Sequence, residues 1–440
     1  MGARAGGWVA GLLGCAVVIA GGCGGRGVPR DGGAPHDVKA DVTAPVDAGE
    51  TRDVGADALT PVDAGGTRDV EADATAPVDL GGIDAAAGDA PDGAADTSTA
   101  DVGAPVDAPA ADALEVGPMA CGTADAGSGG DARTDAASGT FAEFPLPVGS
   151  RSPDFITSGH GKLWFTGGDV FQLFSTITTD GCLTDYPGSQ DPLAVQASAM
   201  TFAPDGNVWF IQTTVGQVGH IAPDGSSLWV LDLPFATVPL AITLGPDGNI
   251  WFAAYGTNAI GRVTLGGVFT SFPTPTAFSA PTNLTNGPDG RLWFAERSPP
   301  AKIGSIDPAT GTIEERLIPD NGTPTPGGRM VLGPDGNLWF INYRDADGCL
   351  VTRVTPSGTF TDFPIAGGTF LRNIAVGPDG NLWLTELDAN KIARLSPSNG
   401  TVIEYPVPTP DSQPSAITAG PDGNIWFTEY RVGRIGRLTP

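Results

Sequence analysis

The residues best able to bind a ligand stand at two fixed places in a pattern that the sequence repeats seven times. One place lies three residues after each of seven regularly spaced tryptophans, and its occupants are Gly167, Gln212, Ala254, Glu296, Asn342, Glu386 and Glu429. The other lies five residues before a turn glycine or its equivalent, and its occupants are Asp154, Ser198, Leu240, Thr282, Gly328, Arg372 and Ser415. If the repeats surround an axis, each place becomes a ring of side chains.

One side of these rings is richer in polar groups than the other. An apolar shelf comes from Leu240 and Ala254. A polar, acidic pocket beside such a shelf suits an amphiphilic ligand, or a divalent ion held by two carboxylates. We therefore predict a ligand site made of Asp154, Glu296, Asn342, Arg372, Glu386, Ser415 and Glu429. The open alternative is a solvated channel mouth without a specific ligand.

The elements that must position these residues are short strands. The tryptophans Trp164, Trp209, Trp251, Trp293, Trp339, Trp383 and Trp426 recur about every 42 to 46 residues. Within one copy, apolar strands at 240–244 and 249–253 flank an Asp-Gly turn, and further strands follow at 260–263 and 269–272. Asp-Gly between apolar runs is a strong hairpin signal. Four antiparallel strands in a period of this length are typical of a propeller blade, so we predict an all-β, seven-bladed β-propeller.

This architecture brings the two sets of side chains to one place. Because the first and second strands of a blade run antiparallel, the start of the first and the end of the second lie at the same edge. In a propeller that edge rims the central channel. Both rings are therefore expected at one mouth of the channel.

The two ends of the repeat region predict how the ring closes. The last copy stops after its third strand, at 434–438. The segment 141–147, before the first complete copy, has the fourth-strand pattern seen at 361–364. We expect this N-terminal strand to complete the last blade, which leaves no open sheet edge at the seam.

Two repeated features have structural explanations. The aromatic residues at alternate positions are expected to pack between neighbouring sheets. The aspartates of the Asp-Gly turns are isolated acids that do not supply the six or more oxygens that calcium takes, so turn formation explains them better.

The first 139 residues have a different character. Residues 1–23 resemble a bacterial lipoprotein signal, with a short apolar run before Cys23. We predict lipidation of Cys23, with plain secretion as the alternative. Residues 24–139 are acidic, repetitive and almost free of aromatic residues, and are predicted to be a disordered tether. The expected location is therefore the outer membrane or cell surface, with the propeller at 140–440 held to the membrane by the lipid.

Charge and cysteine content limit the partners. The net charge is -27, which argues against nucleic acid, because phosphate binding needs clustered Lys and Arg. We expect a monomer whose mouth binds a small molecule or a surface polymer. Outside the signal segment, Cys121, Cys182 and Cys349 remain. A bond between Cys121 and Cys182, or three free thiols, are both open.

The last repeat resembles the virginiamycin B lyase family. The string Gly-Pro-Asp-Gly-Asn-Ile-Trp-Phe-Thr-Glu at 420–429, followed by Ile-Gly-Arg-Leu at 435–438, carries the resemblance, which extends over about residues 140–440. It implies a seven-bladed propeller that linearises cyclic depsipeptides by magnesium-assisted elimination, with a histidine as base and glutamates on the metal. Elimination needs a base of near-neutral pKa and a metal that polarises the ester carbonyl.

The resemblance fails at the positions that carry the chemistry. The resemblance implies a histidine that acts as the base and a second histidine that contacts the substrate, but Arg372 and Ser415 stand at these positions. Gln413 stands where the resemblance implies an acid. Glu429 alone matches a metal-binding glutamate, so Mg²⁺ is a cofactor only by resemblance. We therefore expect a surface-tethered binding or scaffolding propeller that has lost the elimination chemistry. The alternative is a magnesium-dependent lyase of streptogramin B antibiotics.

Overall fold

The computed structural model describes residues 120–121, 139–147, 152–167, 172–187, 197–319, 325–344, 348–365 and 370–440, all within one compact unit. The predicted signal segment, the lipidation site at Cys23 and nearly all of the predicted tether lie outside these residues. Within them, no helix has the length and apolar character needed to cross a membrane.

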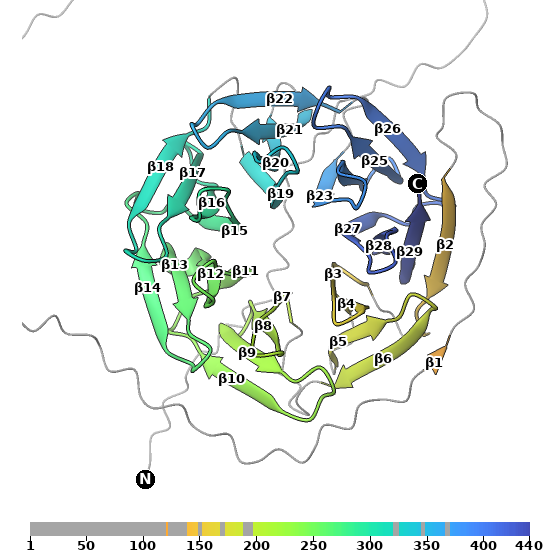
Figure 1. Ribbon diagram of the computed structural model, residues 1–440, viewed down its shortest axis with the longest axis horizontal. Helices are drawn as coiled ribbons and strands as arrows, with labels where there is room; N and C mark the ends of the chain where they lie inside the picture. Colours follow the sequence, from red (N-terminus) through yellow and green to blue (C-terminus); the bar gives the residue numbers. More distant parts are fainter. Residues whose placement is uncertain are drawn as a thin grey trace, which may run out of the picture. The chain divides into compact units, whose positions relative to one another are not determined.

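Seven antiparallel sheets stand around a central axis, which confirms the predicted seven-bladed β-propeller (Figure 1). Blade 1 contains β3 (Phe155–Gly159), β4 (Lys162–Thr166), β5 (Gln172–Ile177) and β6 (Cys182–Pro187), with β1 (Ala120–Cys121) beyond β6. Blade 2 contains β7 (Ala199–Phe202), β8 (Val208–Gln212), β9 (Gln217–Ile221) and β10 (Leu228–Asp232). Blade 3 contains β11 (Pro239–Leu244), β12 (Ile250–Ala254), β13 (Ala259–Val263) and β14 (Phe269–Pro273), with the 3-10 turn η1 (Tyr255–Thr257).

The remaining blades repeat the same order. Blade 4 contains β15 (Pro281–Asn286), β16 (Leu292–Glu296), β17 (Lys302–Ile306) and β18 (Ile313–Leu317). Blade 5 contains β19 (Thr325–Leu332), β20 (Leu338–Arg344), β21 (Gly348–Val354) and β22 (Phe360–Pro364). Blade 6 contains β23 (Leu371–Val376), β24 (Leu382–Glu386), β25 (Lys391–Leu395) and β26 (Val402–Pro406). Blade 7 contains β27 (Pro414–Ala419), β28 (Ile425–Glu429), β29 (Arg434–Thr439) and β2 (Thr140–Pro145). In Figure 1 the first strand of each blade lies nearest the axis.

The N-terminal strand closes the ring as predicted. β2 pairs antiparallel with β29, with Thr140 opposite Thr439 and Pro145 opposite Arg434. Phe144 stacks on Trp426 at a ring separation of 5.4 Å, so the added strand also packs into the core of the last blade. The third strand, β29, is thereby paired on both edges, and the two ends of the propeller support each other.

The turn aspartates hold the tryptophans. In each of blades 2 to 7 the turn aspartate accepts a hydrogen bond from the indole N–H four residues later, at 2.8 to 3.1 Å; the acceptors are Asp205, Asp247, Asp289, Asp335, Asp379 and Asp422. Trp164 in blade 1 donates instead to the carbonyl oxygen of Gly159, at 3.0 Å. All seven of these tryptophans are at most 1% exposed. The repeated acid therefore fixes the buried ring as well as the turn.

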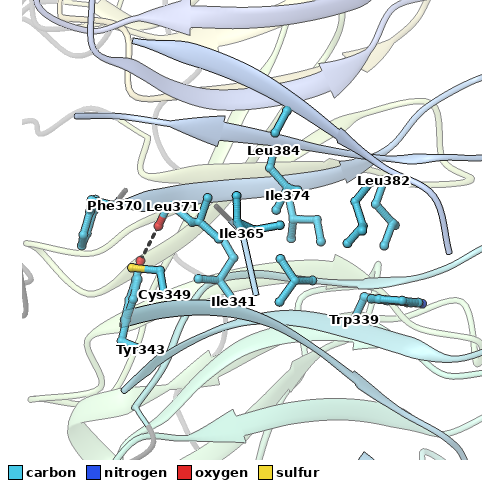
Figure 2. Packing of buried hydrophobic residues seen from close by; sticks show 13 residues of the cluster. Trp339, Ile341, Tyr343, Cys349, Ile365, Phe370, Leu371, Ile374, Leu382 and Leu384 are labelled. Carbon is cyan, nitrogen blue, oxygen red and sulfur yellow. Dashed lines mark hydrogen bonds between the residues drawn. The ribbon is translucent and has the colours of Figure 1, made fainter. Parts of the chain in front are cut away.

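Neighbouring blades pack through apolar side chains. Between blades 5 and 6, Ile341 and Tyr343 pack against Leu371, Ile374 and Leu384 (Figure 2). The buried hydroxyl of Tyr343 donates to the carbonyl oxygen of Leu371 at 2.7 Å, drawn as a dashed line in Figure 2. This bond links the second strand of one blade to the start of the first strand of the next, which is where the mouth lies.

One short strand comes from the region predicted to be a disordered tether. β1 pairs with β6, and its register places Cys121 opposite Cys182. Cys182 is disulfide-bonded, as is Cys349 in β21. The free-thiol alternative is therefore wrong for Cys182 and Cys349, and the register agrees with the other alternative, a bond between Cys121 and Cys182.

Candidate ligand-binding site at the channel mouth

A bulge in the first strand brings side chains to the mouth. In blades 3 to 7 the register between first and second strands shifts near the start of the first strand. In blade 6 the shift falls between Leu371 and Ile374, and in blade 7 it falls between Pro414 and Ile417. A bulge leaves residues outside the ladder and re-aims their side chains. Arg372 and Ser415 occupy such unpaired positions.

Three of the predicted residues meet here, although they come from three blades. The Arg372 guanidinium donates to Asp154 Oδ1 at 3.3 Å, and the Ser415 hydroxyl donates to the same oxygen at 2.8 Å. The side chains of Arg372 and Asp154 are 31% and 51% exposed, whereas Ser415 is buried. An ion pair this exposed adds little stability, so its importance lies in setting the shape and charge of the mouth.

Threonines of the second strands hold the bulges in place. Thr385 Oγ1 accepts the backbone N–H of Asn373 at 3.0 Å and donates to the carbonyl oxygen of Ser415 at 2.8 Å. Thr428 Oγ1 accepts the backbone N–H of Ala416 at 2.9 Å. These contacts satisfy backbone groups that the bulge removes from the ladder. The threonines directly before Glu386 and Glu429 were the available signal, and the sequence prediction did not use them.

Arg329 is a mouth residue that the repeat count missed. Counting back from the turn selected Gly328, but the bulge of β19 spans both Gly328 and Arg329. The Arg329 guanidinium lies 5.6 Å from the ring centre of Phe155, the residue that follows Asp154. Arg329 comes from blade 5 and Phe155 from blade 1, so this contact joins two blades that are not neighbours in the ring.

The predicted second ring lies beneath the mouth. Glu296, Asn342, Glu386 and Glu429 are at most 1% exposed. Asn342 donates to the hydroxyl of Thr352 at 3.3 Å. Each glutamate stands opposite the cation that begins the third strand of its blade, namely Lys302, Lys391 and Arg434. The structure thus places these side chains within the blades, whereas Asp154, Arg372 and Ser415 form the upper layer.

Burial changes the acidity of two of these glutamates. Burial and the negative charge of Glu143 raise the pKa of Glu429 to about 8, and Arg434 and Ser412 offset this only in part. Burial and the charge of Glu315 likewise raise the pKa of Glu296 to about 7. At neutral pH Glu429 is therefore mostly protonated, and Glu296 is close to half protonated.

The donors around Glu429 do not suit a magnesium ion. In the described parts of the chain, no group of three or more His, Cys, Asp or Glu side chains is placed to hold a metal. Glu143, the nearest second carboxylate, already accepts from the backbone N–H and hydroxyl of Thr409 and from Arg434. Mg²⁺ prefers near-octahedral oxygen ligands and anionic carboxylates. A protonated Glu429 beside an arginine supplies neither, so no reaction step is assigned to a metal here.

Comparison with known proteins identifies the family. The description "Virginiamycin B lyase family" matches residues 127–328 and 237–440. The chain belongs to the virginiamycin B lyase family. Among curated proteins, none matches the sequence.

Solved structures agree with this assignment. The chain is 32% identical to a catalytically inactive histidine-to-alanine variant of virginiamycin B lyase from Staphylococcus aureus, crystallised with quinupristin; the TM-score is 0.62 over 69% of this chain and 100% of that chain. A streptogramin B lyase structure is 29% identical, with a TM-score of 0.60 over 68% of this chain and 97% of that chain. Hydrazine synthase from Kuenenia stuttgartiensis, at 16% identity and a TM-score of 0.56 over 67% and 97% of the two chains, shares the fold alone.

Proposed function

We propose that this member of the virginiamycin B lyase family is a ligand-binding propeller that has lost the elimination chemistry. The observation that supports this most is the network of Asp154, Arg372 and Ser415 at the mouth. Two of these residues stand where the family resemblance implies histidines. A serine hydroxyl and an arginine that is always protonated cannot remove a proton near neutral pH.

The described histidines do not replace the missing base. His220 lies on β9, where it stacks on Trp229 and packs against Trp209. Burial lowers its pKa, which Asp205 partly offsets. His160 lies in the turn between the first and second strands of blade 1, at the channel end opposite the mouth. Within the described residues, neither imidazole is placed to reach a ligand bound beside Arg372.

Binding without chemistry needs only the features that the mouth retains. It has exposed charged groups, buried supports and a neighbouring apolar surface, a combination typical of small-molecule sites. We further propose that the chain is exported, that a lipid on Cys23 anchors it to the outer membrane, and that it is a monomer whose ligand is a small molecule or a surface polymer.

The test is a ligand screen on the full chain carrying Cys23→Ser, read as a shift in melting temperature. A ligand at the mouth should lose most of its stabilising effect in Arg372→Gln and Ser415→Ala. Arg291→Gln is the matched control, because Arg291 follows a turn glycine at the opposite end of the channel and bonds to Glu314. Ligands whose effect survives both mouth substitutions, or is lost only in the control, would contradict binding at the mouth.

A further inference from the structure

Two guanidinium groups from neighbouring blades converge on consecutive residues of blade 1. Arg372 of blade 6 contacts Asp154 at 3.3 Å, and Arg329 of blade 5 lies 5.6 Å from the ring of Phe155. Since Asp154 and Phe155 are adjacent in sequence, both arginines reach the start of the first strand of blade 1. Neither position follows from the family chemistry, because one is the substituted histidine position and the other belongs to a bulge.

The charges at this place do not cancel. In the described part of the chain, Asp154 is the one carboxylate that contacts Arg372, and Arg329 has a ring contact but no carboxylate partner. Glu386 and Glu429 lie beneath the mouth and are fully buried. A third cation, Arg297, is close enough to act with Arg372 on Tyr343: burial raises the pKa of this phenol to about 12, and the two arginines offset part of that rise. Three arginines thus act at the mouth, although the exposed acids Asp388 and Asp411 lie in loops on the same face.

These arginines have unused hydrogen-bond donors. A guanidinium has five N–H donors arranged to grip a carboxylate or phosphate. Arg372 uses one nitrogen on one oxygen of Asp154, and that carboxylate is half exposed. Arg372 therefore has donors left for an incoming oxyanion, while burial lowers the pKa of the Arg329 guanidinium, a penalty that an anionic partner beside it would offset.

An exposed apolar surface lies on the same face. The loops at this end that lie within or between blades 2, 3 and 4 are 213–216, 233–238, 255–258, 274–280 and 297–301; they contain no acid and one base, Arg297. Phe235 is 99% exposed and Phe278 is 87% exposed, with Val215 and Tyr255 also exposed nearby in the loops of blades 2 and 3. We call Phe235, Tyr255 and Phe278 the aromatic rim.

Phe278 is also held in an unfavourable backbone conformation. Its φ is 57°, in the left-handed region that bulky residues rarely adopt. In the corresponding loop before blade 7, Asp411 has a φ of 53°, and Asp tolerates this conformation well. Asn258 Oδ1 holds this loop by accepting the Ser279 hydroxyl at 2.8 Å and the Ala280 N–H at 3.2 Å, so hydrogen bonds of the fold account for the backbone conformation. They do not account for the exposure of the Phe278 ring, and a large apolar side chain left in water suits contact with an apolar ligand.

We infer that the mouth binds an amphiphilic organic anion, with its carboxylate or phosphate held between Arg329 and Arg372 and its apolar body on the aromatic rim. This inference rests on the proposed binding function and names the ligand class. An acidic protein repels anions at long range, so a specific anion site requires local arginines of this kind. The loops of blades 2 to 4, which contain no acid and expose Phe235 and Phe278, match the apolar part of such a ligand.

The test uses four short probes with the same apolar chain: octyl phosphate, octanoate, octyl glucoside and octyltrimethylammonium. Calorimetric titration of the full chain carrying Cys23→Ser should show octyl phosphate or octanoate binding at least about tenfold more tightly than the neutral and cationic probes, as expected for charge-assisted hydrogen bonds. The order of the two anions tells a phosphate ligand from a carboxylate ligand. Inorganic phosphate alone should bind more weakly than octyl phosphate, because it lacks the apolar body.

Substitutions locate the site. Arg329→Gln and Arg372→Gln should each weaken octyl phosphate binding about tenfold or more, and Phe235→Ser should weaken it less. Arg431→Gln is the matched control, since Arg431 is exposed in a loop on the same face but lies in blade 7, away from the aromatic rim. Equal affinity for octyl glucoside, unchanged affinity in both arginine variants, or no binding of either anion would overturn the inference. The proposed function fails separately, if the protein opens the ring of quinupristin or if no ligand responds to mouth substitutions.

Discussion

The blade framework and the channel mouth differ in how strictly they repeat. In six blades an aspartate at the equivalent turn position accepts a hydrogen bond from the tryptophan indole, at a donor–acceptor distance of 2.8 to 3.1 Å. At the mouth, by contrast, the equivalent bulge positions hold different chemical groups, among them Arg372, Ser415 and the pair Gly328 and Arg329. The framework thus tolerates little change, while the mouth can exchange one chemistry for another on the same backbone.

The largest expected effect of a substitution lies in the framework. Trp383→Ala removes a fully buried ring that packs in blade 6 and should lower the free energy of unfolding by about 3 to 5 kcal/mol. Chemical denaturation measures the change. Trp229→Ala, on the outer strand β10 and only partly buried, is the control and should cost clearly less. Equal losses in both variants would show that the inner layer of the blades is not the more tightly packed one.

The buried layer under the mouth should show an intermediate, pH-dependent effect. Because the folded protein raises the pKa of Glu429 to about 8 from 4.5, the stability linked to its proton is fully present below about pH 4.5 and is lost as the pH rises toward 8. Glu429→Gln removes this titration. Relative to the variant, the wild-type protein should therefore lose on the order of a few kcal/mol between pH 5 and pH 9.

Unfolding curves at several pH values measure this difference. Glu314→Gln is the control, because the Glu314 side chain is 54% exposed in an outer strand, away from the mouth. If the wild-type protein and Glu429→Gln lose stability in parallel between pH 5 and pH 9, Glu429 is ionised in the folded state. The buried layer beneath the mouth then carries its negative charge.

The smallest effect on stability is expected at the mouth itself. Arg372→Gln breaks an ion pair whose partners are 31% and 51% exposed, so the free energy of unfolding should change by less than about 1 kcal/mol. Thermal melting of the variant beside the wild-type protein measures this. A loss as large as that of Trp383→Ala would mean that the mouth network supports the fold, and the distinction between framework and mouth would be wrong.

The sequence alone allowed the framework to be predicted well. Periodic tryptophans fixed the number of blades, and the incomplete last copy correctly placed residues 141–147 beside β29. Those inferences succeeded because strand pairing and ring closure follow from patterns that repeat. The hydrogen bond that the Trp426 indole N–H donates to Asp422 was not expected, since turn formation already explained the aspartate.

The site could be predicted only in part. Counting along the repeat placed Asp154, Arg372 and Ser415 correctly at one mouth, because they share one strand position. It could not reveal Arg329, since counting along the repeat selects one residue in each blade, whereas the bulge of β19 leaves both Gly328 and Arg329 outside the ladder. It also could not show that Glu296, Glu386 and Glu429 are buried, because depth depends on how neighbouring blades cover a strand end.

The central claim is that the mouth binds a ligand without elimination, and the most direct test is the rate of quinupristin ring opening with Mg²⁺ from pH 6 to pH 9. Elimination across the ester opens the ring without changing the mass, so the product is an isomer with a new carboxylate and a new double bond, resolved by chromatography and fragmentation. Virginiamycin B lyase from Staphylococcus aureus serves as the positive control. We predict a rate equal to that of buffer at every pH. A catalysed rate that rises through pH 8, as Glu429 loses its proton, would contradict the account.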